Sequence, residues 1–388
     1  DEIGVAAINV DLLGARTETL AQVCAAAGMT TAAFVSNGVL RRPRAAQMEF
    51  GLARGFELYD DTMDSREPKR PMSERRATAC ADATLKWIAA RGDDEPFFLW
   101  THFQDPHGPY VPPPEYEARF LRVPSADDVE IPVGNTQLGL GQLPAYQYLP
   151  QHVGEAQRAA GVSVQAYRER YAAEIAYFDA QLGRVLDALR ARGWWDDTLI
   201  VFTADHGEAL GEHGYWFCHG ENLQRELVRV PLIVKFAHDG ESAPIGVRAS
   251  TVSHLDLWPT VLAELRLAAP QSRGTALRTR PEGGERIVVQ MLGAPGTAKR
   301  QIAVGDDRYR LIVPEHAQPR LYDVRADPRE ERDLAAEQPE LVGVLRAKLE
   351  RYLALDPRPH TPGVQRELDS DAQRALRELG YTDAEAHK

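Results

Sequence analysis

The chain has 388 residues, of which 44% are hydrophobic and 26% are charged, and its formal net charge is −12. This composition is typical of a globular protein of two or three domain-sized units, and the acidic balance argues against a duplex nucleic-acid-binding protein, which needs a basic face. No run approaches eighteen apolar residues, so the sequence predicts no transmembrane helix. The first residues also lack the features of a signal peptide. The three cysteines are scattered and predict no disulfide framework.

Helical and strand patterns alternate along the first two thirds of the chain. Apolar spacing predicts longer helices at 19–27, 74–91 and 167–192, short helices at 222–227 and 253–265, and buried strands at 30–35, 96–103, 199–202 and 230–236. A helix followed directly by a strand is half of a β-α-β unit, so an α/β fold with a mostly parallel central sheet is expected. Residues 62–75 are predicted to form a mobile loop, and residues 117–165 to form an insertion that covers a substrate.

The pattern changes from about residue 268 onward. Strands predicted at 286–291, 301–304 and 309–313 indicate a small antiparallel sheet, and a turn-rich connector at 321–335 and charged helices at 338–355 and 369–380 follow. The sequence therefore predicts an α/β domain over residues 1–267 and an α+β subdomain over residues 268–388.

Histidines and carboxylates gather where strands are predicted to end. The strand at 96–103 leads to His102, Asp105 and His107, and the strand at 199–202 leads to Asp205, His206, His213 and His219. Ligands of open α/β sheets bind outside the carboxyl ends of the strands. Asp and His suit a divalent cation, and further imidazoles can bind an anion or protonate a leaving oxygen. Together they indicate cleavage of phosphate or sulfate esters, although each histidine taken alone could be a structural hydrogen-bonding residue.

Six segments in order resemble the sulfatase family of the alkaline phosphatase superfamily. They are residues 19–36, 51–61, Asp105-Pro-His-Gly-Pro-Tyr110, Thr203-Ala-Asp-His-Gly-Glu-Ala-Leu-Gly-Glu-His-Gly214, 228–234 and 321–335. The resemblance implies a mostly parallel central sheet flanked by helices, with a small C-terminal antiparallel sheet plus helix. It also implies a small-molecule or glycan sulfate or phosphate ester as the substrate. The location stays open, with export to the periplasm or outside the cell an expectation from the family alone. The oligomeric state is left open.

The resemblance assigns four site residues by their positions in these motifs. It implies that Asp205 and His206 are metal ligands, and that His107 and His219 are catalytic residues that contact the sulfate or phosphate group. The implied cofactor is a divalent metal ion: calcium for a true sulfatase, zinc or manganese for a phosphoryl enzyme. His219 stands where sulfatases typically have a lysine, and here the chain is similar to the phosphoethanolamine-transferase branch. His213 stays open between a structural and a functional role.

The nucleophile of the family has no counterpart in the sequence. The family carries "C/S-x-P-S-R" or a Ser/Thr nucleophile after its first strand, whereas neither Cys24 nor Cys80 is followed by such a motif. Asp11 lies too close to the first helix to be the first-strand ligand. We therefore expect a chain truncated at its N-terminus. Three functions remain open: metal-dependent hydrolysis of sulfate esters, phosphoester hydrolysis or phosphoethanolamine-type transfer with Ser or Thr, and a catalytically inactive binding role.

Overall fold

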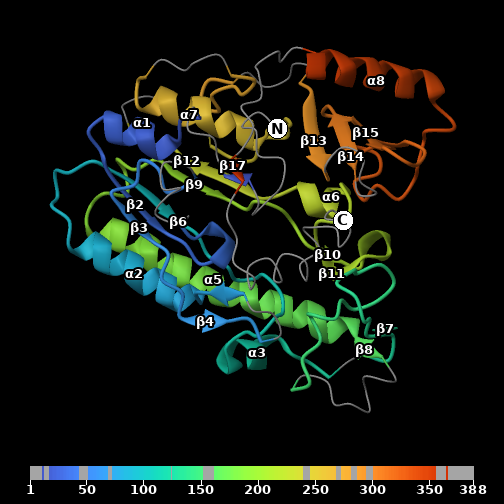
Figure 1. The fold of residues 1–388 in the computed structure, drawn as a ribbon, viewed down its shortest axis with the longest axis horizontal. Helices are drawn as coiled ribbons and strands as arrows, with labels where there is room; N and C mark the ends of the chain where they lie inside the picture. Colours follow the sequence, from blue (N-terminus) through green and yellow to red (C-terminus); the bar gives the residue numbers. More distant parts are fainter. Residues whose placement is uncertain are drawn as a thin grey trace. The chain divides into compact units, whose positions relative to one another are not determined.

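A computed structural model describes most of the chain (Figure 1). The described residues are 11–12, 17–42, 51–68, 72–123, 125–151, 161–238, 245–267, 272–280, 286–293, 300–354 and 364–365. They fall into two compact units, residues 1–193 with 210–218 and 360–388, and residues 194–209 with 219–359. Among the described residues, no helix combines the length and the apolar character needed to cross a bilayer. The domain boundary expected near residue 267 stays a prediction.

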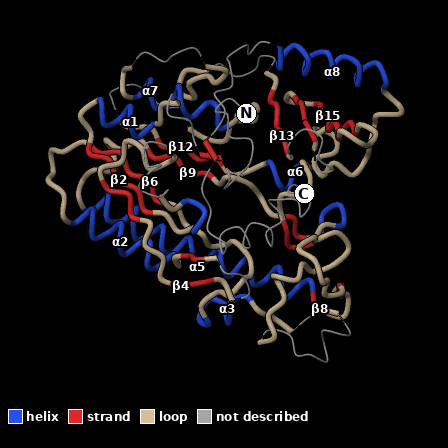
Figure 2. The backbone as a smooth tube through the Cα atoms, in the orientation of Figure 1, coloured by secondary structure: helices blue, strands red, loops and turns tan. Residues whose placement is uncertain are grey.

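The first unit holds a three-stranded parallel sheet. The helices and strands of the whole first unit, in chain order, are β1 (Asp11–Leu12), α1 (Leu20–Ala26), β2 (Thr30–Phe34), the 3-10 turn η1 (Gly38–Leu40), β3 (Leu58–Asp60), β4 (Ser65–Arg66), β5 (Ser73–Glu74), α2 (Ala77–Ala89), β6 (Phe97–Thr101), α3 (Pro114–Phe120), β7 (Glu130–Ile131), β8 (Val162–Ser163), α5 (Val164–Ala191), the 3-10 turn η3 (Glu212–Gly214), β11 (Trp216–Cys218) and β17 (Val364–Gln365). The strand order is β3-β2-β6, and both pairings are parallel. The predicted parallel sheet is confirmed, and Figure 2 shows β2 beside β6.

Strand β2 is apolar on both faces, as expected for a strand covered from both sides. Alternate side chains point to opposite faces. One face places Ala32 and Phe34 in a cluster with Cys80 of α2, and the other places Ala33 in a cluster with Tyr59 of β3. The continuous apolar run, rather than an alternating one, is therefore what the buried position requires.

Two helices of the first unit illustrate how local sequence sets their ends and faces. Helix α1 begins after Thr19, whose hydroxyl accepts from the N–H of Gln22 while the Gln22 side chain accepts from the N–H of Thr19, a complete capping box. Helix α5 lies beside α2 in Figure 1. Its buried face carries Glu174 and is not purely apolar, and Ile175, expected on the apolar stripe, is 42% exposed.

Two regions expected to be loops contain regular structure. Within residues 62–75, expected to be mobile, β4 and β5 pair as an antiparallel hairpin. Within residues 117–165, α3 ends at Phe120, and β7 and β8 form a second short antiparallel pair. These strands are only two residues long and show no period-2 run from which they could have been predicted.

The second unit combines an antiparallel strand pair with a four-stranded antiparallel sheet. Its elements are β9 (Ile200–Thr203), α6 (Arg225–Val228), β12 (Leu232–Lys235), the 3-10 turn η4 (His254–Asp256), α7 (Leu257–Glu264), β13 (Val288–Leu292), β14 (Gln301–Gly305), β15 (Tyr309–Pro314), β16 (Arg320–Asp323) and α8 (Pro339–Ala354), and β10 (Ala209–Leu210) joins the two units. β12 and β9 are antiparallel. The predicted small C-terminal sheet is confirmed in the order β13-β14-β15-β16, and α8 covers it with Leu345 and Leu349. Strand β16 overlaps the start of the connector predicted at 321–335, and the helix expected at 369–380 falls outside the described residues.

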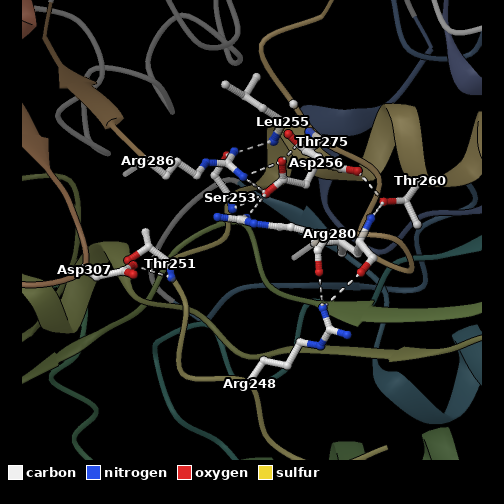
Figure 3. A network of polar contacts seen from close by, with 12 residues as sticks. Arg248, Thr251, Ser253, Leu255, Asp256, Thr260, Thr275, Arg280, Arg286 and Asp307 are labelled. Carbon is white, nitrogen blue, oxygen red and sulfur yellow. Dashed lines mark hydrogen bonds and ion pairs between the residues drawn. The ribbon is translucent and has the colours of Figure 1, made fainter. Parts of the chain in front are cut away.

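A buried carboxylate organises the start of α7 (Figure 3). Asp256 is fully buried and accepts hydrogen bonds from the backbone N–H groups of Ser253 at 2.9 Å and Thr275 at 2.7 Å. Arg286 Nη1 lies 2.5 Å from Asp256 Oδ2, and Arg280 Nη1 lies 3.4 Å from the same oxygen. The carboxylate is saturated by donors of its own unit, so this network is a structural clamp.

Candidate functional site

The end of strand β9 presents two metal-donor side chains. Asp205 Oδ1 accepts from the backbone N–H of His206 at 3.0 Å, and His206 Nδ1 lies 2.8 Å from the carbonyl oxygen of Gly207. A proton on Nδ1 donated to that carbonyl leaves the lone pair of His206 on Nε2, the form in which imidazole binds a metal. Nε2 lies 3.8 Å from Asp205 Oδ2. The two remaining donor atoms thus face each other, a spacing that small side-chain movements would adapt to one divalent cation.

Residue 207, directly after this pair, is a glycine because a side chain would not fit there. A Cβ atom on Gly207 would lie 1.9 Å from the backbone oxygen of Glu226, and the Gly207 N–H donates to the carbonyl of Leu227 at 2.8 Å. The backbone after His206 therefore packs directly against α6, and a side chain at residue 207 would push the two segments apart. This contact fixes the backbone from which Asp205 and His206 project.

His219 lies next to this pair, held by a carboxylate that the sequence analysis missed. The rings of His206 and His219 are stacked, with centroids 4.1 Å apart and planes 27° apart. His219 Nδ1 lies 3.0 Å from Glu208 Oε2, and both side chains are about nine-tenths buried. A carboxylate at Nδ1 fixes the orientation of the ring. The Nε2 edge then points away from the carboxylate, where it can bind a ligand or exchange a proton. The signal available in the sequence was the glutamate directly after Asp-His-Gly.

The imidazole of His254, which the sequence did not indicate as a site residue, lies at the end of β9. His254 Nε2 lies 2.9 Å from the hydroxyl of Thr203, the last residue of the strand. Burial lowers the pKa of His254 from its usual value, and the nearby Asp205 carboxylate acts in the opposite direction. A neutral imidazole here contributes hydrogen bonding rather than positive charge. No sequence spacing links residues 51 positions apart.

The described residues supply a partial metal-ligand set. Over these ranges of the chain, no three His, Cys, Asp or Glu side chains are grouped so that they could hold one ion. Asp205 and His206 fit a divalent cation in donor chemistry and in their mutual orientation. They provide two donors of the four or more that such an ion takes.

The loop after β6 carries His107 in the first unit. The His107 N–H donates to the carbonyl of Gln104 at 2.8 Å, and His107 Nδ1 lies 3.7 Å from Glu67 Oε1. The neighbouring residues predicted with it are structural. His102 Nδ1 accepts from the N–H of Ser36 at 3.4 Å, and Asp105 accepts from the N–H of Ala77 at the start of α2 at 2.9 Å.

A buried acid pair fixes the base of this loop. Burial and the proximity of Asp105 raise the pKa of Glu174 to about 8, and burial raises the pKa of Asp105 as well, against the opposing charge of Arg76. The Glu174 carboxyl also accepts from the N–H of Val111 at 2.8 Å. Near neutral pH the two carboxyl groups therefore retain a proton between them, which stabilises both ends of the loop that carries His107.

The three cysteines and His213 are the remaining residues considered from the sequence. Burial raises the pKa of Cys24 and of Cys80 to about 11 each. A buried thiol of this kind is inert near neutral pH, and Cys218 is also buried. His213 belongs to the first unit, within η3, and has a left-handed φ of +52°.

Comparison with known proteins gives a consistent set of relatives. A family model described as Sulfatase matches residues 3–265. The Multifunctional alkaline phosphatase superfamily protein PehA of Trinickia caryophylli is 29% identical over 245 residues, which are 56% of this chain and 46% of that protein. Choline-sulfatase of Rhizobium meliloti (strain 1021) is 32% identical over 179 residues, 45% of this chain and 34% of that protein. The chain thus spans less than half the length of these curated relatives.

The solved structures agree on the fold. The structure of BT4656 in complex with D-glucosamine-2-N,6-O-disulfate superimposes with a TM-score of 0.64 at 19% identity and covers 90% of this chain and 85% of its own. At this identity the likeness concerns the fold alone. It confirms the α/β architecture with a parallel sheet and a small C-terminal antiparallel sheet that the sequence predicted.

Proposed function

Because the chain belongs to the sulfatase family, we propose that it carries part of a site for metal-dependent hydrolysis of sulfate esters. The observation that supports this most directly is the group of three side chains at the end of β9. Asp205 and His206 present donor atoms 3.8 Å apart, and the His219 ring stacks on His206 with Glu208 behind it. A metal-donor pair beside an oriented imidazole suits the cleavage of an anionic ester.

Each side chain has a distinct role in this proposal. Asp205 and His206 would hold a divalent cation, which when bound supplies positive charge at an oxygen of the ester. His219 presents Nε2 to the sulfuryl group, because Glu208 occupies its Nδ1 side. For His107, on the loop after β6 of the first unit, we propose contact with a sulfate group on the basis of the family resemblance alone. An Nε2–H of either imidazole can donate to a sulfuryl oxygen or protonate the leaving alkoxide near neutral pH.

The substrate class follows from the relatives and stays broad. One relative is named a choline-sulfatase, and one neighbouring structure holds a sulfated glucosamine. A small organic or glycan sulfate monoester is therefore the substrate we propose. Calcium is the cation that the family resemblance implies for a sulfate-specific enzyme. Of the two proposed ligands, the Asp205 carboxylate suits calcium, whereas the His206 imidazole nitrogen suits zinc.

The experiment is hydrolysis of nitrophenyl sulfate by this protein, with calcium, manganese or zinc added. Turnover that falls at least about 100-fold in Asp205→Asn, as expected for loss of a metal ligand or an essential charge, supports the proposal. Replacing the exposed His238 by Gln is the matched control. Full turnover in Asp205→Asn would refute the metal-ligand role of Asp205. No turnover together with no metal uptake by the parent protein would refute the hydrolase proposal and favour an inactive binding role.

Phosphoryl transfer is the second candidate function, and one observation favours it. His219, backed by Glu208, occupies a position at which sulfatases typically carry a lysine, and an imidazole is common at phosphoryl sites of the related transferases. The match to a multifunctional alkaline phosphatase superfamily protein is in line with this. Nitrophenyl phosphate and nitrophenyl phenylphosphonate in the same assay separate the two candidates, since a higher kcat/KM on either phosphorus ester than on the sulfate would favour the phosphoryl function with zinc or manganese.

A further inference from the structure

Arg310 and Glu330 form a buried ion pair in the second unit. Arg310 lies on β15, and Glu330 lies in the connector after β16. Arg310 Nη1 lies 2.8 Å from Glu330 Oε1 and 3.0 Å from Oε2, and the two side chains are 11% and 0% exposed. Glu330 also has a left-handed φ of +56°, which is unfavourable for a residue with a Cβ atom. A buried pair with such a backbone is stable only where further hydrogen bonds satisfy both charges.

The ion pair also holds the backbone at the start of α6. Arg310 Nη2 donates to the carbonyl oxygen of Leu223. The N–H of Arg225, the first residue of α6, donates to Glu330 Oε2 at 3.0 Å. Hydrogen bonds to charged groups are stronger than those between neutral groups. The cation and the anion of the pair therefore each bind one backbone group of this segment, and together they fix where α6 begins.

Helix α6 in turn meets the backbone directly after the metal-donor pair. The Gly207 N–H donates to the carbonyl oxygen of Leu227 at 2.8 Å, and a Cβ atom on Gly207 would lie 1.9 Å from the backbone oxygen of Glu226. Arg225, Glu226 and Leu227 are consecutive, so the contact to Glu330 and the contacts to Gly207 lie within a single turn of helix. A shift of the first residue of α6 therefore moves the carbonyl groups against which Gly207 packs.

We propose that Glu330 is a positioning residue for the metal-donor pair Asp205 and His206. Paired with Arg310, it fixes the start of α6, and α6 fixes the backbone at Gly207 from which the metal-donor pair projects. The C-terminal sheet and its connector thereby set the geometry at the end of β9, although the metal-donor pair lies on another element. The inference rests on the proposed function only in the role given to Asp205 and His206.

The test removes the link between Glu330 and α6 and leaves the ion pair in place. Arg225→Pro deletes the N–H that Glu330 accepts. Proline is tolerated at the first position of a helix. Gln224, the residue before it, already has the extended backbone that a following proline favours, with φ −67° and ψ 159°. Arg225→Ala removes the same side chain but keeps the N–H, and is the matched control.

The readout is the rate of hydrogen exchange at the Gly207 N–H, measured by NMR without metal or substrate. Arg225→Pro should raise this rate at least about 10-fold, because the contact to Leu227 opens more easily, and Arg225→Ala should leave it unchanged. Calcium, manganese and zinc are then each titrated alone. For the cation that the parent binds, the dissociation constant should rise about 10-fold in Arg225→Pro, as expected when support behind a metal ligand is lost.

The outcomes separate this inference from the proposed function. An unchanged exchange rate at Gly207 in Arg225→Pro would overturn it, and so would an unchanged cation affinity. An equal rise in Arg225→Ala, or at the amides of β14, would also count against it, because the effect would then not come from the lost N–H. If Arg225→Pro does not fold, Glu330→Gln, which keeps the size of the side chain and removes its charge, is measured in the same way. Faster exchange at Gly207 confined to Arg225→Pro, in a protein that binds no cation and hydrolyses no ester, leaves the link from Glu330 to Gly207 intact and removes the proposed function instead.

Discussion

Replacing Glu174 by Gln should remove a specific pH dependence of the stability of this protein. Glu174 is buried on α5 beside Asp105, and its pKa is raised to about 8 because of burial and that neighbouring carboxylate. Glutamine has the size of a protonated glutamate and can still donate to Asp105. The variant therefore imitates the protonated pair and cannot lose its proton.

The sign and the size follow from the pKa. The pKa of Glu174 rises from 4.5 to about 8 on folding, so the folded chain binds the proton more tightly than the unfolded chain does. This contribution to stability is fully present below about pH 4.5 and is lost as the pH rises through about 8. Over that window the unfolding free energy of the parent should decrease by up to about 1.4 kcal/mol per pH unit relative to Glu174→Gln. Between pH 5 and pH 7 the relative change is roughly 2–3 kcal/mol.

Urea unfolding of the parent and of Glu174→Gln at pH 5, 6, 7 and 8 measures this difference. Asp179→Asn, which removes an exposed carboxylate from the same helix, is the control and should show no comparable trend. A difference between parent and Glu174→Gln that stays constant from pH 5 to pH 8 would refute the shared proton. A difference that grows in favour of the parent with pH would refute the sign.

Three further substitutions test other parts of the structure by thermal or urea unfolding. Gly207→Ala should lower the melting temperature, because its Cβ would lie 1.9 Å from a backbone oxygen of α6, and an unchanged melting temperature would mean that the two segments are not in contact. Asp256→Asn should cost about 3 kcal/mol, since it leaves Arg286 without its buried counter-charge, and a loss below about 1 kcal/mol would contradict that pairing. Thr19→Ala should cost about 1 kcal/mol through loss of the capping box, and Thr19→Ser, which keeps the hydroxyl, should restore most of it.

The long apolar patterns of this sequence predicted its main elements because burial alone determined them. Strand β2 is covered on both faces, so every residue from Ala32 to Phe34 is apolar and the run is visible without any partner. Helix α5 was predicted in extent, but its buried face was not. Glu174 lies on that face beside Asp105, which is distant in sequence. The spacing of apolar residues along the helix does not reveal such a partner.

The site residues also differ in how far the sequence alone could reveal them. Asp205 and His206 are adjacent in sequence and follow a recognisable strand, so their common position could be predicted. Glu208 pairs with His219 across a turn, and Glu67 reaches His107 from a hairpin 40 residues earlier. These pairings are set by tertiary packing. The sequence shows that a glutamate follows Asp-His-Gly, but it does not show which histidine that glutamate meets.

The two imidazoles assigned to the ester share an electrostatic arrangement that bears on the charge of the substrate. In each pair the glutamate is more buried than the histidine, with side-chain exposures of 1% against 16% for Glu67 and His107, and 7% against 11% for Glu208 and His219. A buried carboxylate alone would repel a sulfate or phosphate group, because charges in a poorly solvated region interact strongly. In each pair the carboxylate lies at the Nδ1 edge of the ring, so the imidazole and not the carboxylate is the group proposed to meet the anion. In the proposed function, an imidazole at residue 219 would thus take the place of the lysine that is typical of sulfatases.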